Sequence, residues 1–314
     1  MLNRLRHRWS VVASLVVAVA FALSLRHSLS HSNIMNHSLN ISIGQQGAEV
    51  VRHSPVPIDH SGVNGLRMYD AGRPNKILGA TVVLKEDYST ITFPPVEHLT
   101  FYEEGSTGGG IDEISLDLWL PAQPKSRTDV RGWDDYDEAV RKLVQDTINR
   151  INRAGWQRWI MFSMPRLSGR DTIAFEPDYR NRGYSAEWQE TWGIDPSYQM
   201  TPEDWANLSK RWSTWYWIKN GATIELRYRK DFRSPQMPIV FDDLTVTIKS
   251  ADTTSGGFYG PTKGDWKTYK QSETLRLLTT RKQREAAARA AGATILEDYK
   301  DYPVGGVRLP EKSQ

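Results

Sequence analysis

The residues able to do chemistry are spread unevenly along this 314-residue chain. All seven histidines lie at or before His98, and there is no cysteine. Disulfides, thiolate catalysis and cysteine-ligated zinc are therefore excluded, and a Ser-His-Asp triad would have to use His98. We interpret His98 as a partly buried neighbour of Pro94-Pro95. We accordingly predict no catalytic residue of these kinds, no cofactor and no metal site.

Carboxylate chemistry remains open. Residues that could supply a general acid and base are Asp112, Glu113, Asp117, Glu187, Glu190, Asp242 and Asp243. The twelve tryptophans could stack on sugar rings beside such a pair. An envelope glycan hydrolase or glycan-binding module is thus one alternative. The missing histidines and cysteines favour the other, a binding protein without turnover.

Aromatic residues gather in and beside a long polar connection, residues 175–202. Long connections of this kind are often functional, and large aromatic side chains anchor protein interfaces. The binding residues predicted here are Trp188, Trp192, Tyr198 and Trp205. Trp215 and Trp217, by contrast, are expected on the core face of a strand.

The element expected to organise the body is a β-hairpin over residues 212–229. Asn220-Gly221 suits a type I′ turn, which needs positive φ at both central positions. This turn sets the expected cross-strand pairs, Trp217 with Ile224 and Trp215 with Leu226. The opposite, wetter face is expected to carry Thr214, Thr223, Glu225 and Arg227. We predict that this hairpin forms the centre of an antiparallel sheet.

Other patterns complete an α+β fold with two long helices. Strands are expected at residues 80–84, 90–93, 114–120, 156–162, 244–248 and 293–296. Long helices are expected at residues 134–154 and 272–291, with Gly155 and Gly292 as their C′ residues. Thr201 is expected to cap a short helix. Because each long helix follows strands and precedes one, two β-β-α-β units meeting near residues 170–200 are a further hypothesis.

The N-terminus predicts a membrane segment. Trp9 to Leu25 is an uncharged apolar run that follows Arg4, Arg6 and Arg8. We favour an uncleaved transmembrane signal anchor over residues 1–26, and a cleavable signal peptide is the alternative. The positive-inside rule then places the body on the periplasmic side of the inner membrane. Residues 27–61 are expected to be a flexible tether and 62–314 the folded body.

Charge argues against nucleic acid as a partner. Met1 to Arg26 holds four arginines and no acid, so the rest of the chain holds 36 of the 40 basic residues and all 37 acidic ones. A body with a net charge of −1 lacks the basic excess that binds a phosphate backbone.

Three segments in the second half resemble a protein family. They are Pro165-Arg166-Leu167-Ser168-Gly169, the stretch from Asp195-Pro196-Ser197-Tyr198 to Glu203-Asp204-Trp205, and the stretch from Arg284-Glu285-Ala286 to Tyr302-Pro303. They are similar to membrane-anchored envelope proteins of Gram-negative bacteria encoded beside type VI secretion effectors. The resemblance implies an immunity role: a periplasmic protein that binds and neutralises a secreted toxin. The expected partner is therefore a toxin or another envelope protein.

Overall fold

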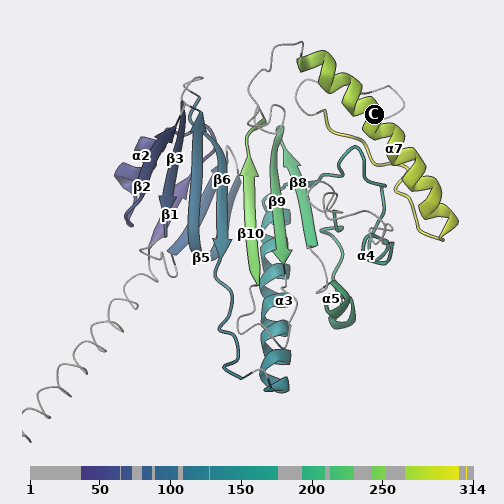
Figure 1. Ribbon diagram of the computed structural model, residues 1–314, viewed down its shortest axis with the longest axis horizontal. Helices are drawn as coiled ribbons and strands as arrows, with labels where there is room; N and C mark the ends of the chain where they lie inside the picture. The colour runs from purple at the N-terminus through teal and green to yellow at the C-terminus, as the bar shows by residue number, and fades with distance from the viewer. Residues whose placement is uncertain are drawn as a thin grey trace, which may run out of the picture.

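The computed structural model describes residues 37–63, 65–72, 80–86, 89–104, 109–126, 128–175, 193–208, 213–229, 242–251, 266–303 and 309. Its fold is α+β (Figure 1). The predicted anchor, Trp9 to Leu25, lies outside this part of the chain, as do Trp188 and Trp192. Within the described residues, no helix has the length and apolar character that crossing a membrane requires.

One mixed sheet of ten strands organises the described residues. The strands are β1 (Ser38–Ile41), β2 (Asp59–Val63), β3 (Leu66–Ala71), β4 (Ala80–Glu86), β5 (Ser89–Glu104), β6 (Ile111–Leu118), β7 (Gln157–Arg158), β8 (Ser213–Lys219), β9 (Ala222–Arg229) and β10 (Asp243–Lys249). Their order is β1-β4-β5-β6-β10-β9-β8-β7, and β3, with β2 beside it, pairs with β5. The sheet is mixed rather than purely antiparallel, because β1 runs parallel to β4.

Two long helices and several short ones accompany the sheet. The helices are α2 (Gly47–His53), α3 (Val130–Arg153), α4 (Asp171–Ala174), α5 (Pro202–Leu208) and α7 (Trp266–Ala290). Both long helices begin earlier than the periodicity suggested. Asp129 caps α3 by accepting a hydrogen bond from the Gly132 N–H at 2.9 Å. Gly155 and Gly292 have φ of 79° and 87°, which confirms the predicted C′ positions.

The expected tether does not extend to residue 61. Residues 38–61 hold β1, α2 and most of β2, and Leu39, Ile41 and Val50 are buried in the main core. The fold therefore begins about two dozen residues before Gly62, the start that we predicted. The expectation failed because β1 offers only two inward apolar residues, too few to show a period, and gains its place by pairing with residues 81–84.

The second predicted strand, residues 90–93, is part of a much longer one. β5 continues through Pro94-Pro95 to Glu104 and pairs with β4, β3 and β6 in turn. Proline cannot donate to a sheet ladder, which is why the pair was expected to end the strand. The register between β4 and β5 shifts between Thr81 and Val83, beside the prolines. This irregularity accommodates the missing donors.

The predicted hairpin is confirmed. Asn220 and Gly221 have φ of 50° and 84°, and the two expected tryptophan pairs form in the expected register. Two parts of the prediction were wrong. The hairpin lies toward one end of the sheet, with β6 and β10 at the middle. Thr214 and Thr223 are buried, because further chain covers β8 on its second face.

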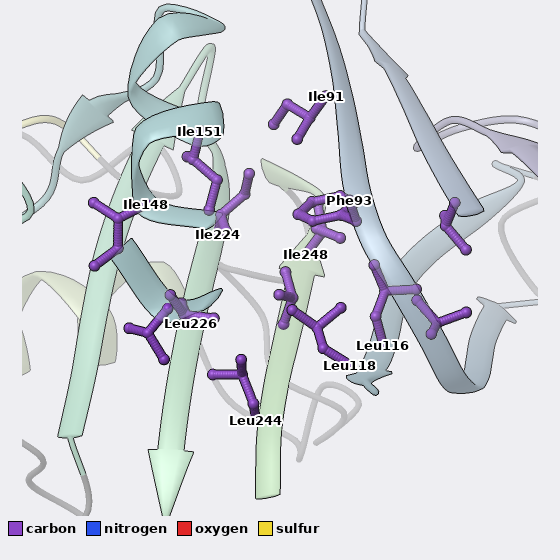
Figure 2. Packing of buried hydrophobic residues seen from close by; sticks show 14 of the residues in the cluster. Ile91, Phe93, Leu116, Leu118, Ile148, Ile151, Ile224, Leu226, Leu244 and Ile248 are labelled. Carbon is purple, nitrogen blue, oxygen red and sulfur yellow. The ribbon is translucent and has the colours of Figure 1, made fainter. Parts of the chain in front are cut away.

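The main core lies between the sheet and α3 (Figure 2). The helix turns one apolar stripe toward the strands: Tyr136, Val140, Val144, Ile148 and Ile151. Opposite it lie Trp215, Trp217, Ile224 and Leu226, all fully buried. In β8 and β9 these inward residues are the ones that alternation predicted.

The second long helix packs on the other side of β8. Leu278 of α7 lies in a cluster with Phe162, Ile218 and Leu309. Ile218 alternates with Trp217 along β8, so α7 and α3 lie on opposite faces of the same sheet. Residues 156–162 form only the two-residue β7, and residues 293–296 contribute one isolated bridge, Leu167 with Ile295. Both strand predictions were wrong there. The organisation into two β-β-α-β units stays a hypothesis.

Candidate functional site

Of the predicted binding residues, the structure describes Trp205, which is buried, and Tyr198, which is partly exposed. Trp205 is 3% exposed, and its ring stacks on Tyr228 with centroids 4.9 Å apart. The Tyr198 hydroxyl donates a 2.6 Å hydrogen bond to Asp204. Trp205 therefore belongs to the core, and Tyr198 supports the first turn of α5. For Trp205, aromatic content beside a connection was mistaken for exposure, whereas the proposed roles of Tyr198, Trp188 and Trp192 stay predictions.

The segments that carried the family resemblance, together with arginines outside them, form four ion pairs to buried carboxylates, here called the arginine network. Its four pairs are Arg158–Asp195 at 3.1 Å, Arg166–Glu285 at 2.7 Å, Arg170–Asp204 at 3.1 Å and Arg281–Asp301 at 2.6 Å. All four carboxylates are buried. A buried charge needs a partner, and each carboxylate has one with good geometry.

The network also holds the irregular chain after α3. Arg281 donates to the carbonyls of Ile160 and Met161, and Arg284 donates to that of Ser163. These bonds replace the ladder that a regular strand would have supplied to its backbone. The residues of the resemblance therefore have a structural role here: they fasten α7 to residues 160–167.

Electrostatics within the network favour the charged carboxylates. Burial acts to raise the pKa of Asp195, but the Arg158 charge and hydrogen bonds from Gly169 and Ser197 outweigh it and hold the pKa below its ordinary value. The same balance, with Arg166 as partner, lowers the pKa of Glu285. Neither carboxyl is therefore tuned toward general acid chemistry.

The single histidine of the predicted body lies between two carboxylates. His98 Nδ1 lies 3.2 Å from Asp117, and Nε2 lies 3.0 Å from Asp70 and 3.4 Å from the Thr100 hydroxyl. Both ring nitrogens therefore lie within hydrogen-bonding distance of a carboxylate. The ring thus crosslinks β3, β5 and β6, and is not a simple neighbour of Pro94-Pro95.

This crosslink lies at one end of a polar sheet face. The polar face consists of the outward residues of five strands: Asp70, His98, Thr100, Tyr102, Glu113, Ser115, Asp117, Glu225, Arg227, Arg229, Asp243, Thr245, Thr247 and Lys249. Cross-strand pairing arranges them in rows, for example Asp117, Thr245 and Arg227. Most are half-buried, and the side chains of Asp117, Arg227 and Lys249 are 37–39% exposed.

Charges on the polar face are largely compensated within it. Lys249 lies 3.7 Å from Glu113, Arg229 lies 2.5 Å from Asp243, and Arg227 pairs with Glu225. Burial raises the pKa of Glu113 and of Asp243, while the basic partners oppose the rise. Three of the carboxylates considered for catalysis, Glu113, Asp117 and Asp243, are therefore engaged with basic groups.

The other catalytic candidates are dispersed. Asp242 accepts a 3.0 Å hydrogen bond from the Tyr136 hydroxyl, and Asp112 accepts one from the Glu104 N–H at 3.1 Å. Glu187 and Glu190 lie outside the described residues. Over the part of the chain that the structure describes, no three His, Asp or Glu side chains gather as metal ligands would.

A shallow groove, the Trp119 groove, opens between the end of β6 and α3. Its volume is about 530 Å³, and its lining residues are Pro95, Trp119, Leu120, Pro121, Ala139, Lys142, Leu143 and Asp146. The backbone N–H of Trp119 donates to the Pro95 carbonyl at 2.8 Å, which ties the chain after β6 to β5. Trp119 is 38% exposed. The sequence signal for this site was a tryptophan placed between a strand end and Pro121.

Comparison of the chain with known protein families, with curated proteins and with solved structures found no match. The features that bear on function are therefore the polar face, the arginine network and the Trp119 groove.

Proposed function

We propose that this protein is a binding domain for another protein and that the polar face is its contact surface. The observation that carries the proposal is a broad, half-exposed set of side chains of both signs, presented by five adjacent strands. Residues on strands hold their positions better than residues on loops. A surface of alternating charges gives a partner both orientation and selectivity.

The shape of the polar face favours a protein partner over a small molecule. Small-molecule sites are concave and mostly apolar, whereas protein interfaces combine a polar rim with a wide contact area. The polar face is wide and rich in charge. Its exposed ion pairs contribute little to folding, because exposed pairs are typically worth only about 0–1 kcal/mol. They are thus available to be re-paired across an interface.

We further propose an inhibitor or immunity role in the periplasm, with the body held at the inner membrane by Trp9 to Leu25. The support is the basic start and apolar run of the N-terminus, together with the resemblance to proteins encoded beside type VI secretion effectors. An inhibitor of this kind needs a binding surface and no turnover. The alternative, an envelope glycan hydrolase, has less support because its described carboxylates already have partners.

The test is co-purification of the tagged full chain, in detergent, with lysate and envelope extract of the source cells. We expect one stoichiometric protein partner. Arg227→Gln removes a central charge of the polar face and should weaken that complex about tenfold or more, as loss of an interfacial charge pair does. Arg276→Gln removes a more exposed arginine from α7, 64% against 37% for Arg227, and serves as the control.

Two results would overturn the proposal. One is recovery of glycan without any protein. The other is a folded Arg227→Gln variant that binds the partner as tightly as the unchanged chain does.

A further inference from the structure

We infer that the Trp119 groove binds a neutral glycan chain. This site is separate from the proposed protein contact, because no residue of the polar face lines the groove. The inference rests on three features of the groove: its apolar floor with an exposed indole, its charged wall, and the hydrogen-bonding groups that the wall offers.

The floor is built for flat apolar faces. Pro95, Leu120 and Pro121 surround Trp119, and Leu143 and Ala139 of α3 close the side. Trp119 is 38% exposed and lines the groove with these apolar residues, so its ring adds to an apolar surface that a ligand can cover. A pyranose ring presents a face of C–H groups that stacks on an indole, as other apolar groups do.

The wall carries charge that is already balanced. Along α3, Lys142 lies 3.4 Å from Glu138, and Asp146 lies 2.7 Å from Arg150. At each of these two ion pairs, a charged ligand would meet one attractive and one repulsive side chain, so it would gain little net Coulomb energy. The wall therefore selects a ligand without net charge.

Balanced side chains still form hydrogen bonds of both kinds. Lys142, 71% exposed, is a donor, and Asp146, 46% exposed, is an acceptor. A sugar hydroxyl both donates and accepts, so one ring edge satisfies both residues. A proline-rich peptide, the other common occupant of an aromatic groove, presents carbonyls but few N–H groups and would leave Asp146 facing apolar rings. The neutral glycan is the better match.

The test is saturation-transfer NMR on the full chain in a detergent without a sugar headgroup. The probes are cellotetraose, tetra-N-acetylchitotetraose and a deca-proline peptide. We expect at least one of the two sugars to bind with a Kd of about 1 mM or below, because a shallow site buries little of its ligand. Trp119→Ala should weaken binding about tenfold, which corresponds to about 1.4 kcal/mol.

Two controls and a second variant keep the test decisive. Leu275→Ala removes an apolar side chain that is 45% exposed on α7 and should leave sugar binding unchanged. Arg227→Gln should also leave it unchanged, which separates this inference from the proposed function. If Trp119→Ala does not fold, Lys142→Met tests the wall instead. We expect its affinity for sugar to fall about threefold, which is less than the usual effect of losing one hydrogen bond to a charged group.

The inference is overturned if neither sugar shows binding at a sugar concentration about ten times the expected Kd. It is also overturned if the folded variants bind sugar as tightly as the unchanged chain does. Binding of the deca-proline peptide alone would assign the groove to a peptide instead.

Discussion

Helices α3 and α7 are almost equal in length, at 24 and 25 residues, yet they are held to the same sheet by different forces. The buried stripe of α3 is apolar and packs on tryptophan, isoleucine and leucine. The buried residues of α7 described here are Thr274, Leu278, Arg281, Glu285 and Ala288. Their spacing is also that of a helix face, but two of the five are charged.

The difference teaches that a helix can bury a face without a hydrophobic pattern. In the α3 layer each buried apolar side chain contributes on its own, mostly through removal from water. In the α7 layer the benefit depends on pairs, since a buried charge without its partner costs far more than the pair contributes. The α3 layer should therefore tolerate conservative change, whereas the α7 layer should not.

The largest effect on the free energy of unfolding is expected at Arg281, the buried arginine of α7. Arg281→Ala leaves Asp301 buried without Arg281 and removes one donor from each of the Ile160 and Met161 carbonyls, of which Met161 keeps the Met164 N–H. We expect a loss of about 3–5 kcal/mol in the free energy of unfolding, measured by urea denaturation. Hydrogen exchange should show residues 160–167 and α7 loosening first, while α3 stays protected.

The matched control is Arg276→Ala, which removes an exposed arginine paired with Glu273. It should cost under about 0.5 kcal/mol. If the two variants were equally stable, the buried pair would not be what holds α7, and the contrast between the helices would fail.

A smaller effect is expected from Glu285 and from acid. In the folded protein the pKa values of Asp195, Asp204 and Glu285 are lowered. Their contribution to the free energy of unfolding is therefore fully present above the ordinary carboxyl pKa of about 4, and it is lost as pH falls through the lower, folded-state pKa. Glu285→Gln should cost about 1.5–3 kcal/mol at neutral pH, as loss of a charged hydrogen bond does. It should also flatten the fall in stability below about pH 4.

Acid titrations followed by near-ultraviolet circular dichroism and urea melts would check this. An acid dependence that is the same in Glu285→Gln and in the unchanged chain would contradict the assignment of acid sensitivity to the arginine network.

The smallest effect should come from the α3 layer. Ile148→Val removes one methylene group at a fully buried position, and we expect a loss of about 0.5–1.5 kcal/mol. The loss should be the same at pH 7 and in mild acid, because no titrating group is involved. Thermal unfolding at both pH values measures it, and a loss that grew on acidification would show that the two layers are not independent.

The same contrast explains which features of the fold could be predicted from the sequence. The apolar stripe of α3 and the Asn220-Gly221 turn are local signals, and both predictions held. The fastening of residues 160–167 depends on hydrogen bonds between residues about 120 positions apart, such as that from Arg284 to the Ser163 carbonyl, which no local pattern links. β5 could not be followed past Pro94-Pro95, because its continuation depends on neighbouring strands.

The candidate sites show the same limit. Alternation along β6, β9 and β10 already separated inward from outward residues, so the members of the polar face were identifiable one strand at a time. Their assembly was not, because the pairing of β6 with β10 joins residues about 130 positions apart. Trp205 was misplaced because composition does not reveal exposure. Trp119 was passed over because its strand seemed to account for it.

The early start of the fold limits how far the body can lie from its proposed anchor. Between Leu25 and β1 lie the 12 residues from Arg26 to His37. Fully extended, 12 residues span at most about 43 Å. If the run that ends at Leu25 is held in the membrane, β1 must stay within roughly one small-protein diameter of the bilayer. The proposed toxin would then be bound close to the membrane surface. Inserting residues into the 26–37 segment would increase the distance from the membrane at which the body can bind it.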